Sequence, residues 1–177
     1  VLVEGLRNGE IQPPFALVAK EQTQGIGSRN NTWSGLEGNL FFSFCMSETA
    51  LSGDLKGESA SIYFSMIMRE ALAARGSKIW LKWPNDFYVG DKKIGGTLTT
   101  RVGEIYVCGM GINLKNAPEN AGILDIDVSP SAAVGEFCKM LQTAPSWAEV
   151  FKKFESEFEK SREFITHFDD EEVSLKY

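Results

Sequence analysis

The chain has 177 residues, of which 43% are hydrophobic and 24% charged, and this composition is typical of one globular domain with a substantial core. With 18 Lys and Arg against 24 Asp and Glu, its formal net charge of −6 argues against nucleic acid or an anionic membrane as a partner. The 3 cysteines are widely spaced, and the chain has 1 histidine and no CxxC pair, so we expect reduced thiols, a cytoplasmic protein and no metal site built from protein ligands alone.

The first part of the chain predicts a short amphipathic segment followed by a strand. Residues 1–10 form the segment, which ends at the turn signal Asn8-Gly9, and residues 15–19 form an apolar run of strand length. Because the chain starts at Val1 and stops soon after an acidic stretch, we expect missing residues before the segment and a shortened C-terminal end.

Residues 20–33 lack apolar periodicity and predict a loop rich in Gly, Asn, Ser and Thr. The loop lacks the third glycine of a dinucleotide fingerprint, and no GxxxxGK[ST] sequence occurs in the chain, so Rossmann and P-loop nucleotide sites are disfavoured. Backbone N–H groups around Gly25 and Gly27, the guanidinium of Arg29 and the flat ring of Trp33 would suit a phosphate. A plain glycine-rich surface loop fits the same residues.

A central strand and a core helix follow the loop. Residues 38–46 are apolar on both faces and of strand length, which predicts a strand inside a sheet. Residues 58–75 carry apolar side chains at helical spacing and precede Gly76, an expected helix stop. We interpret the methionines of this helix as packing residues.

Residues 81–96 predict a short hairpin that gathers charge. Its turn is Gly90-Asp91, and it carries Asp86 before the turn and Lys93 after it. The glycines at 95–96 would weaken a strand unless another backbone or a ligand approaches closely. Two interpretations remain open at this point, an anion site or a surface hairpin with solvated lysines and bulge glycines.

The second half of the chain predicts two strands, a linker and two helices. We expect strands at 97–100 and 105–109, a polar linker at 116–130, a helix at 131–142 and a longer helix from the capping-box sequence at 146–149 to about residue 168.

Three motifs in order resemble the signature of biotin protein ligases. They are KWPND at 82–86, KxxGG at 93–96 and GxGIN at 109–113. The likeness spans about residues 18–114 and implies an α+β fold, the class II aminoacyl-tRNA synthetase-like catalytic domain, with a mixed, mostly antiparallel sheet flanked by helices. We therefore expect one catalytic domain over 1–177, without the DNA-binding domain of repressor-type members and with the small C-terminal barrel absent or truncated.

The loop also resembles the family's QxxGRGRxxRxW segment, through Gln22, two glycines and a tryptophan. Ile26 and Ser28 stand where the family usually has arginines, which leaves Arg29 as the one cation of the matched segment from Gln22 to Trp33. A charged hydrogen bond contributes about 1.5 to 3 kcal/mol, so losing both arginines without a replacement would weaken binding of the adenylate. We therefore expect Arg29 to bind the phosphate in their place.

The resemblance implies that biotin and MgATP give biotinyl-5′-AMP, and that a lysine of a biotin carboxyl carrier domain, of acetyl-CoA carboxylase or a similar carboxylase, then displaces AMP. It leaves open a monomer or a homodimer. By the same resemblance, the expected catalytic residues are Lys93, Asp86 and Arg29. The expected biotin-binding residues are Gln22, Gly25, Ile26, Gly27, Ser28, Lys93, Gly96, Gly109 and Gly111. The expected adenylate-binding residues are Arg29, Trp33, Asn85, Lys93 and Asn113.

Two alternatives stay open. A lipoate or octanoate ligase or transferase shares this fold and the acyl-adenylate logic, although the chain lacks the RRxSGGG-type run typical of those enzymes. A non-catalytic biotin-binding regulator would fit the loss of the loop arginines.

Overall fold

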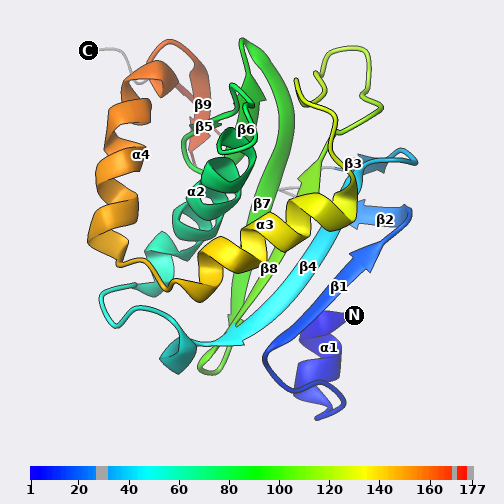
Figure 1. The fold of residues 1–177 in the computed structure, drawn as a ribbon, viewed down its shortest axis with the longest axis vertical. Helices are drawn as coiled ribbons and strands as arrows, with labels where there is room; N and C mark the ends of the chain where they lie inside the picture. The colour runs from blue at the N-terminus through cyan, green and yellow to red at the C-terminus, as the bar shows by residue number, and fades with distance from the viewer. Residues whose placement is uncertain (27–31, 169–170, 175–177) are drawn as a thin grey trace.

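The protein is described by a computed structural model covering residues 1–26, 32–168 and 171–174. Its elements form an α+β fold around one large sheet (Figure 1). The helices are α1 (Leu2–Arg7), α2 (Ala60–Ala73), α3 (Pro130–Gln142) and α4 (Trp147–Ser161), with 3-10 turns η2 (Glu48–Ala50) and η3 (Gly57–Ser59). The strands are β1 (Phe15–Ala19), β2 (Gln22–Ile26), β3 (Thr32–Gly35), β4 (Leu40–Ser47), β5 (Trp80–Lys82), β6 (Asp86–Val89), β7 (Lys92–Val102), β8 (Ile105–Ile112), β9 (Ile165–Phe168) and β10 (Glu171–Ser174).

The main sheet has six strands in the order β1-β4-β8-β7-β6-β5. All of its neighbouring strands pair antiparallel, and β2–β3 and β9–β10 form two small antiparallel pairs beside it. The expected α+β fold, with a sheet flanked by helices, is therefore confirmed. The expectation that the sheet is mixed was wrong, because every strand pair of the described residues is antiparallel. The chain's 3-10 turn η3 and helix α2 also confirm the core helix expected over 58–75, with slightly shorter ends.

One face of the sheet is buried under α2 and α3 (Figure 1). Side chains alternate between faces along a strand, so every second residue of β4 points toward these helices. Phe42 and Phe44 both pack against Phe137 of α3, with ring centroids 5.5 and 5.2 Å apart. Helix α3 starts where Ser129 accepts a hydrogen bond from the backbone N–H of Ala132, with a proline in the first turn.

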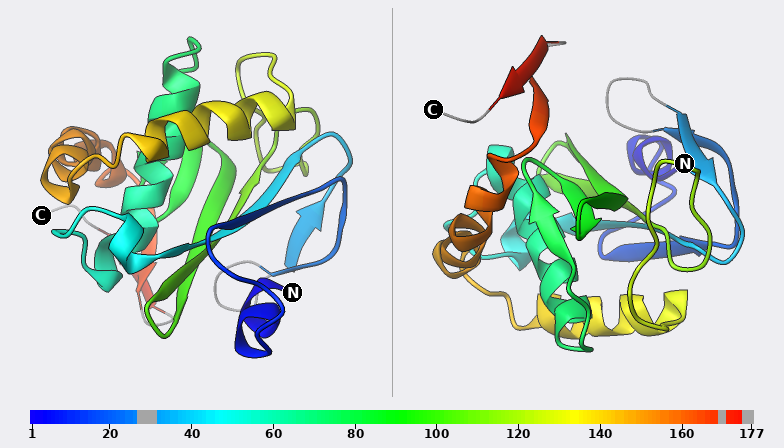
Figure 2. Two further views of the ribbon diagram at one scale, coloured as in Figure 1. Left: turned by 60° about the horizontal axis from the view of Figure 1, so that its bottom comes forward. Right: turned by 90° about the horizontal axis from the view of Figure 1, so that it is seen from above.

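Within the described residues, helix α1 covers one end of the opposite face. Figure 2 shows α1 and α3 on opposite sides of the sheet. Leu2 of α1 packs against Cys45 and Val107, which alternate with the residues of the main core. The glycines of β7 and β8 lie toward the other end of this face.

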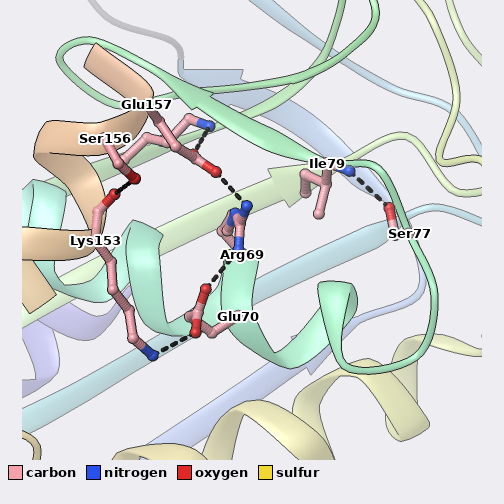
Figure 3. A network of polar contacts seen from close by, with 8 residues as sticks. Arg69, Glu70, Ser77, Ile79, Lys153, Ser156 and Glu157 are labelled. Atoms are coloured by element: carbon pink, nitrogen blue, oxygen red, sulfur yellow. Dashed lines mark hydrogen bonds and ion pairs between the residues drawn. The ribbon is translucent and has the colours of Figure 1, made fainter. Parts of the chain in front are cut away.

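Helix α4 closes the free edge of β5 with polar side chains (Figure 3). The backbone N–H of Leu81 donates to the buried carboxylate of Glu157 at 3.0 Å, and the N–H of Trp83 donates to the hydroxyl of Ser161 at 3.0 Å. Glu157 also forms an ion pair with Arg69 of α2. Side chains of a helix thus satisfy backbone groups that another strand would otherwise pair with.

Several expected boundaries were wrong. The last helix ends at Ser161 instead of about 168, and Ile165–Phe168 form strand β9 paired with β10. Aromatic and β-branched residues at 164–168 fit a strand as well as a helix face, so helical spacing alone could not separate them. The segment 20–33 contains strands β2 and β3 rather than loop alone, and β8 continues to Ile112 through the glycines.

Candidate active site

The sheet register aligns a row of residues on the open face. Asp86 lies opposite Gly96, Gly96 lies opposite Gly111, and Gly111 lies opposite Phe41. Cross-strand partners point to the same face, so this row runs from a carboxylate across two bare backbone positions to an aromatic ring.

A second row lies two residues further along the strands. Leu98 and Ser43 flank Gly109 there, and Leu17 lies beyond Ser43 on the edge strand. Among the described residues, a Cβ built on Gly109 would meet the Oγ of Ser43 at 3.6 Å. The centre of the face is therefore a floor of backbone, which we call the glycine floor (Gly96, Gly109 and Gly111).

Lys93 and Asp86 form an ion pair at one end of the glycine floor. The Nζ of Lys93 lies 2.7 Å from Oδ1 of Asp86, and the side chains are 39% and 22% exposed. A Cβ on Gly96 would lie 3.1 Å from the same Asp86 oxygen and 4.0 Å from Cε of Lys93. Glycine at 96 thus makes room for the pair.

A bulge sets the direction of the Lys93 side chain. Phe87 pairs with Gly95, but Tyr88 pairs with Lys93, so the register shifts by one residue between them. In a regular strand Lys93 would share the helix-covered face with Gly95, two residues away. The bulge moves it instead to the face of Asp86, which is a recognised use of bulges near functional sites.

Two aromatic side chains surround Lys82 of the KWPND motif. The Lys82 side chain is buried, and its Nζ lies 5.6 Å from the ring centroid of Tyr88 and 5.9 Å from that of Phe164. Burial, and then the negative charge of Asp86, raise the pKa of Tyr88 to about 12, so Tyr88 stays neutral at pH 7.

The two expected adenylate-binding asparagines are held by the backbone. The Asn85 amide donates to the carbonyl oxygen of Thr97. Asn113 is buried, and its amide donates to the carbonyl oxygen of Gly122 at 3.1 Å. Because the N–H of Gly122 also donates to the carbonyl oxygen of Lys93 at 2.9 Å, Asn113 and β7 together fix the loop beside the charged pair.

The expected loop residues are only partly described. Gly25 is buried and pairs with Trp33, and Ile26 pairs with Thr32. The side chain of Gln22 is exposed and makes no hydrogen bond within the described residues. The predictions for Gly27, Ser28 and Arg29 lie outside the described residues. The structure therefore brings together the residues expected from β6, β7 and β8, and does not join Gln22 to them.

Sequence reasoning missed the side chains that border the glycine floor, chiefly Ser43 and Leu98. The sequence did hold a signal for Ser43. Successive side chains of a strand over 38–46 point to opposite faces, which puts Phe41 and Ser43 on the face opposite Phe42 and Phe44. In the described part of the chain, no group of three or more His, Cys, Asp or Glu side chains could hold a metal ion. Nor is any helix in that part long and apolar enough to cross a membrane.

The fold places the chain among the biotin and lipoate protein ligases. The chain belongs to the Biotin/lipoate A/B protein ligase family, whose model matches residues 1–115. The resemblance drawn from the three motifs is thereby confirmed.

Curated relatives and solved structures agree with this assignment. The bifunctional ligase/repressor BirA of Escherichia coli is 33% identical over 115 residues, which are 61% of this chain and 35% of that protein. BirA of Bacillus subtilis is 25% identical over 92% of this chain and 50% of its own length. This chain therefore spans half or less of these relatives.

The chain is similar to a solved protein, biotin acetyl coenzyme A carboxylase synthetase from Helicobacter pylori, whose crystal structure contains bound biotinylated ATP. The two sequences are 39% identical. The two structures superpose with a TM-score of 0.93 over 98% of this chain and 83% of that one. Biotin protein ligase from Aquifex aeolicus in complex with biotin and ATP is 26% identical, with a TM-score of 0.72 over 86% of this chain and 73% of its own.

Proposed function

We propose that the chain is the catalytic domain of a biotin protein ligase, which activates biotin with MgATP to biotinyl-5′-AMP and pyrophosphate and transfers biotin to a lysine. The observation that carries the proposal is the Lys93–Asp86 ion pair at the end of a floor of three glycines. The bound ligands named for the Helicobacter pylori and Aquifex aeolicus structures support the same substrates.

In the first half-reaction Lys93 would exchange partners. A carboxylate is a poor electrophile, and attack of its oxygen on the α-phosphorus of ATP gathers negative charge as pyrophosphate leaves. An ammonium already positioned at the end of the floor can leave Asp86 for the substrate carboxylate and then for the phosphoryl oxygens, which stabilises that charge without a covalent enzyme intermediate. Mg²⁺ would arrive on the phosphates of ATP as part of the substrate.

In the second half-reaction Asp86 would act on the acceptor lysine. A lysine amine normally keeps its proton up to a pH of about 10.4, so it needs a base before it can attack. Once Lys93 faces the anion, the Asp86 carboxylate is free to accept a proton from the incoming ammonium. The amine then attacks the acyl carbon, AMP leaves with the electron pair of the anhydride bond, and the nitrogen gives its second proton to solvent as the amide forms.

The remaining roles follow the family resemblance. Arg29 would neutralise the phosphate, and Trp33 and Asn113 would hold adenine. Asn85 would support the adenylate side of the site, in keeping with its hydrogen bond to the backbone of β7. Gln22 and the loop glycines would face biotin.

The partners are proposed on the same basis. We assign the chain as one catalytic domain that acts on the carrier domain of acetyl-CoA carboxylase or a similar carboxylase, as monomer or homodimer. The net charge of −6 speaks against nucleic acid as its ligand. Free thiols at Cys45, Cys108 and Cys138 support a reducing compartment such as the cytoplasm.

Pyrophosphate release tests the proposal. The protein incubated with biotin and MgATP should release pyrophosphate and retain biotinyl-5′-AMP, and lipoate or octanoate in place of biotin should give neither. Turnover with lipoate instead would make it a lipoate ligase. Biotin binding without pyrophosphate would make it a regulator.

A further inference from the structure

The open face of the sheet carries a hydroxyl beside the glycine floor. Ser43 stands between Leu17 and Gly109 in the second row, and its Oγ leans toward the space above Gly109. The residue is half-buried and its hydroxyl makes no hydrogen bond within the described part of the chain. Leu17 and Leu98, which lie on either side in this row, are 41% and 38% exposed.

The position of Ser43 relative to the ion pair defines a direction along the face. Asp86 lies on β6 and Ser43 on β4, three strands away and one row further along. Strands about 4.8 Å apart and a rise of about 3.3 Å per residue place the two Cα atoms about 16 Å from each other. Lys93 reaches inward from the charged end, so the space between its ammonium and the Ser43 hydroxyl is shorter.

An acid with a polar ring at its other end carries its polar groups in the order that these residues would require. The carboxylate would meet Lys93, an aliphatic chain would lie over the backbone of Gly96 and Gly111, and the ring would lie over Gly109 between two leucines. Biotin has this order of groups, because a cyclic urea ends the molecule opposite its carboxylate.

We propose that the Ser43 hydroxyl hydrogen-bonds the urea of biotin and so is a specificity-determining residue of the site; this rests on the proposed function. A hydroxyl can donate to the urea oxygen or accept from a urea N–H. The dithiolane ring of lipoate offers neither group, so binding lipoate there would leave the hydroxyl without a partner in an apolar surround. A site built to hydrogen-bond a substrate group discriminates strongly against an analogue that lacks it.

Calorimetric titration of biotin into the wild type and Ser43→Ala tests the proposal. Loss of a neutral hydrogen bond should raise the Kd for biotin about three- to tenfold. Ser43→Val, which also adds bulk over the floor, should weaken binding further, and the KM for ATP should not change. Ser47→Ala is the matched control, because Ser47 lies at the far end of the same strand and its hydroxyl is hydrogen-bonded to that of Thr49.

A second ligand separates recognition from a structural effect. A thiophane-ring acid that lacks the urea should bind the wild type and Ser43→Ala equally. In neither complex can the residue at position 43 hydrogen-bond a urea, so the substitution removes no such bond. If Ser43→Ala binds biotin within twofold of the wild type, or weakens both ligands equally, the proposal is wrong. If the wild type binds no biotin at all, the proposed function fails first, and the role of Ser43 fails with it.

Discussion

Replacing Glu157 by alanine should destabilise the protein through the edge strand that leads into the site. The substitution removes the acceptor of the Leu81 backbone N–H and one of the two carboxylates around Arg69, the other being Glu70. Strand β5 continues into the KWPND turn, so the same change loosens the segment that carries Asp86.

The structure sets the size of the effect. The side chain of Glu157 is 6% exposed and that of Arg69 is 24% exposed, so the pair is largely but not wholly buried. Breaking a buried pair costs about 3–5 kcal/mol, and the lower end applies because the arginine is partly solvated and keeps Glu70. At about 2–4 °C per kcal/mol for a domain of this size, Tm should fall by roughly 6–12 °C.

Thermal and urea unfolding of three variants decide the point. Glu157→Gln keeps an acceptor for Leu81 but loses the charge, and should be intermediate. Glu155→Ala on the exposed side of the same helix is the control and should stay within about 0.5 kcal/mol of the wild type. The reasoning is refuted if Glu157→Ala unfolds with the same free energy as Glu155→Ala.

Four further predictions concern the site and the core. Lys93→Ala should abolish biotinyl-AMP formation, whereas Asp86→Ala should mainly slow transfer to the carrier; single-turnover assays of the two half-reactions would show equal losses if this division is wrong. Gly95→Ala should lower the free energy of unfolding by about 1–3 kcal/mol, because its methyl group would collide with a backbone carbonyl of the neighbouring strand. Burial acts to raise the pKa of Asp125, but the hydrogen bonds that it accepts lower it below 3.8. The resulting stabilisation is present above pH 3.8 and lost as the pH falls further, so the stability difference between wild type and Asp125→Asn should shrink between pH 7 and pH 3; a constant difference would contradict it. Burial raises the pKa of Cys108 to about 12, so mass spectrometry should find this thiol unalkylated in native protein at pH 8 and alkylated in urea.

The sequence predicted which glycines and charged residues lie close together, because its motifs are local. KxxGG and GxGIN place glycines on adjacent strands, and antiparallel pairing then brings Gly96 opposite Gly111. The pair Asp86 and Lys93 was expected on one hairpin, and the structure joins them in an ion pair.

What the sequence could not predict depends on register and tertiary contact. The bulge that turns Lys93 to the open face is a shift of one residue between two strands. The glycines at 95–96 allow a bulge, but they do not fix which residue it turns. The buried role of Glu157 was equally hidden, because a glutamate on an amphipathic helix ordinarily faces solvent. Ser43 became a candidate only when pairing placed Gly109 beside it.

The central claim is that one substrate lies extended across the glycine floor with its acid at Lys93. A crystal structure of the protein with biotin and an ATP analogue that cannot react tests this most directly. The account predicts the biotin carboxylate within ion-pair distance of the Nζ of Lys93 and the fused rings over Gly109, beside Ser43. A biotin molecule with its carboxylate remote from Lys93, or bound on the helix-covered face, would contradict it.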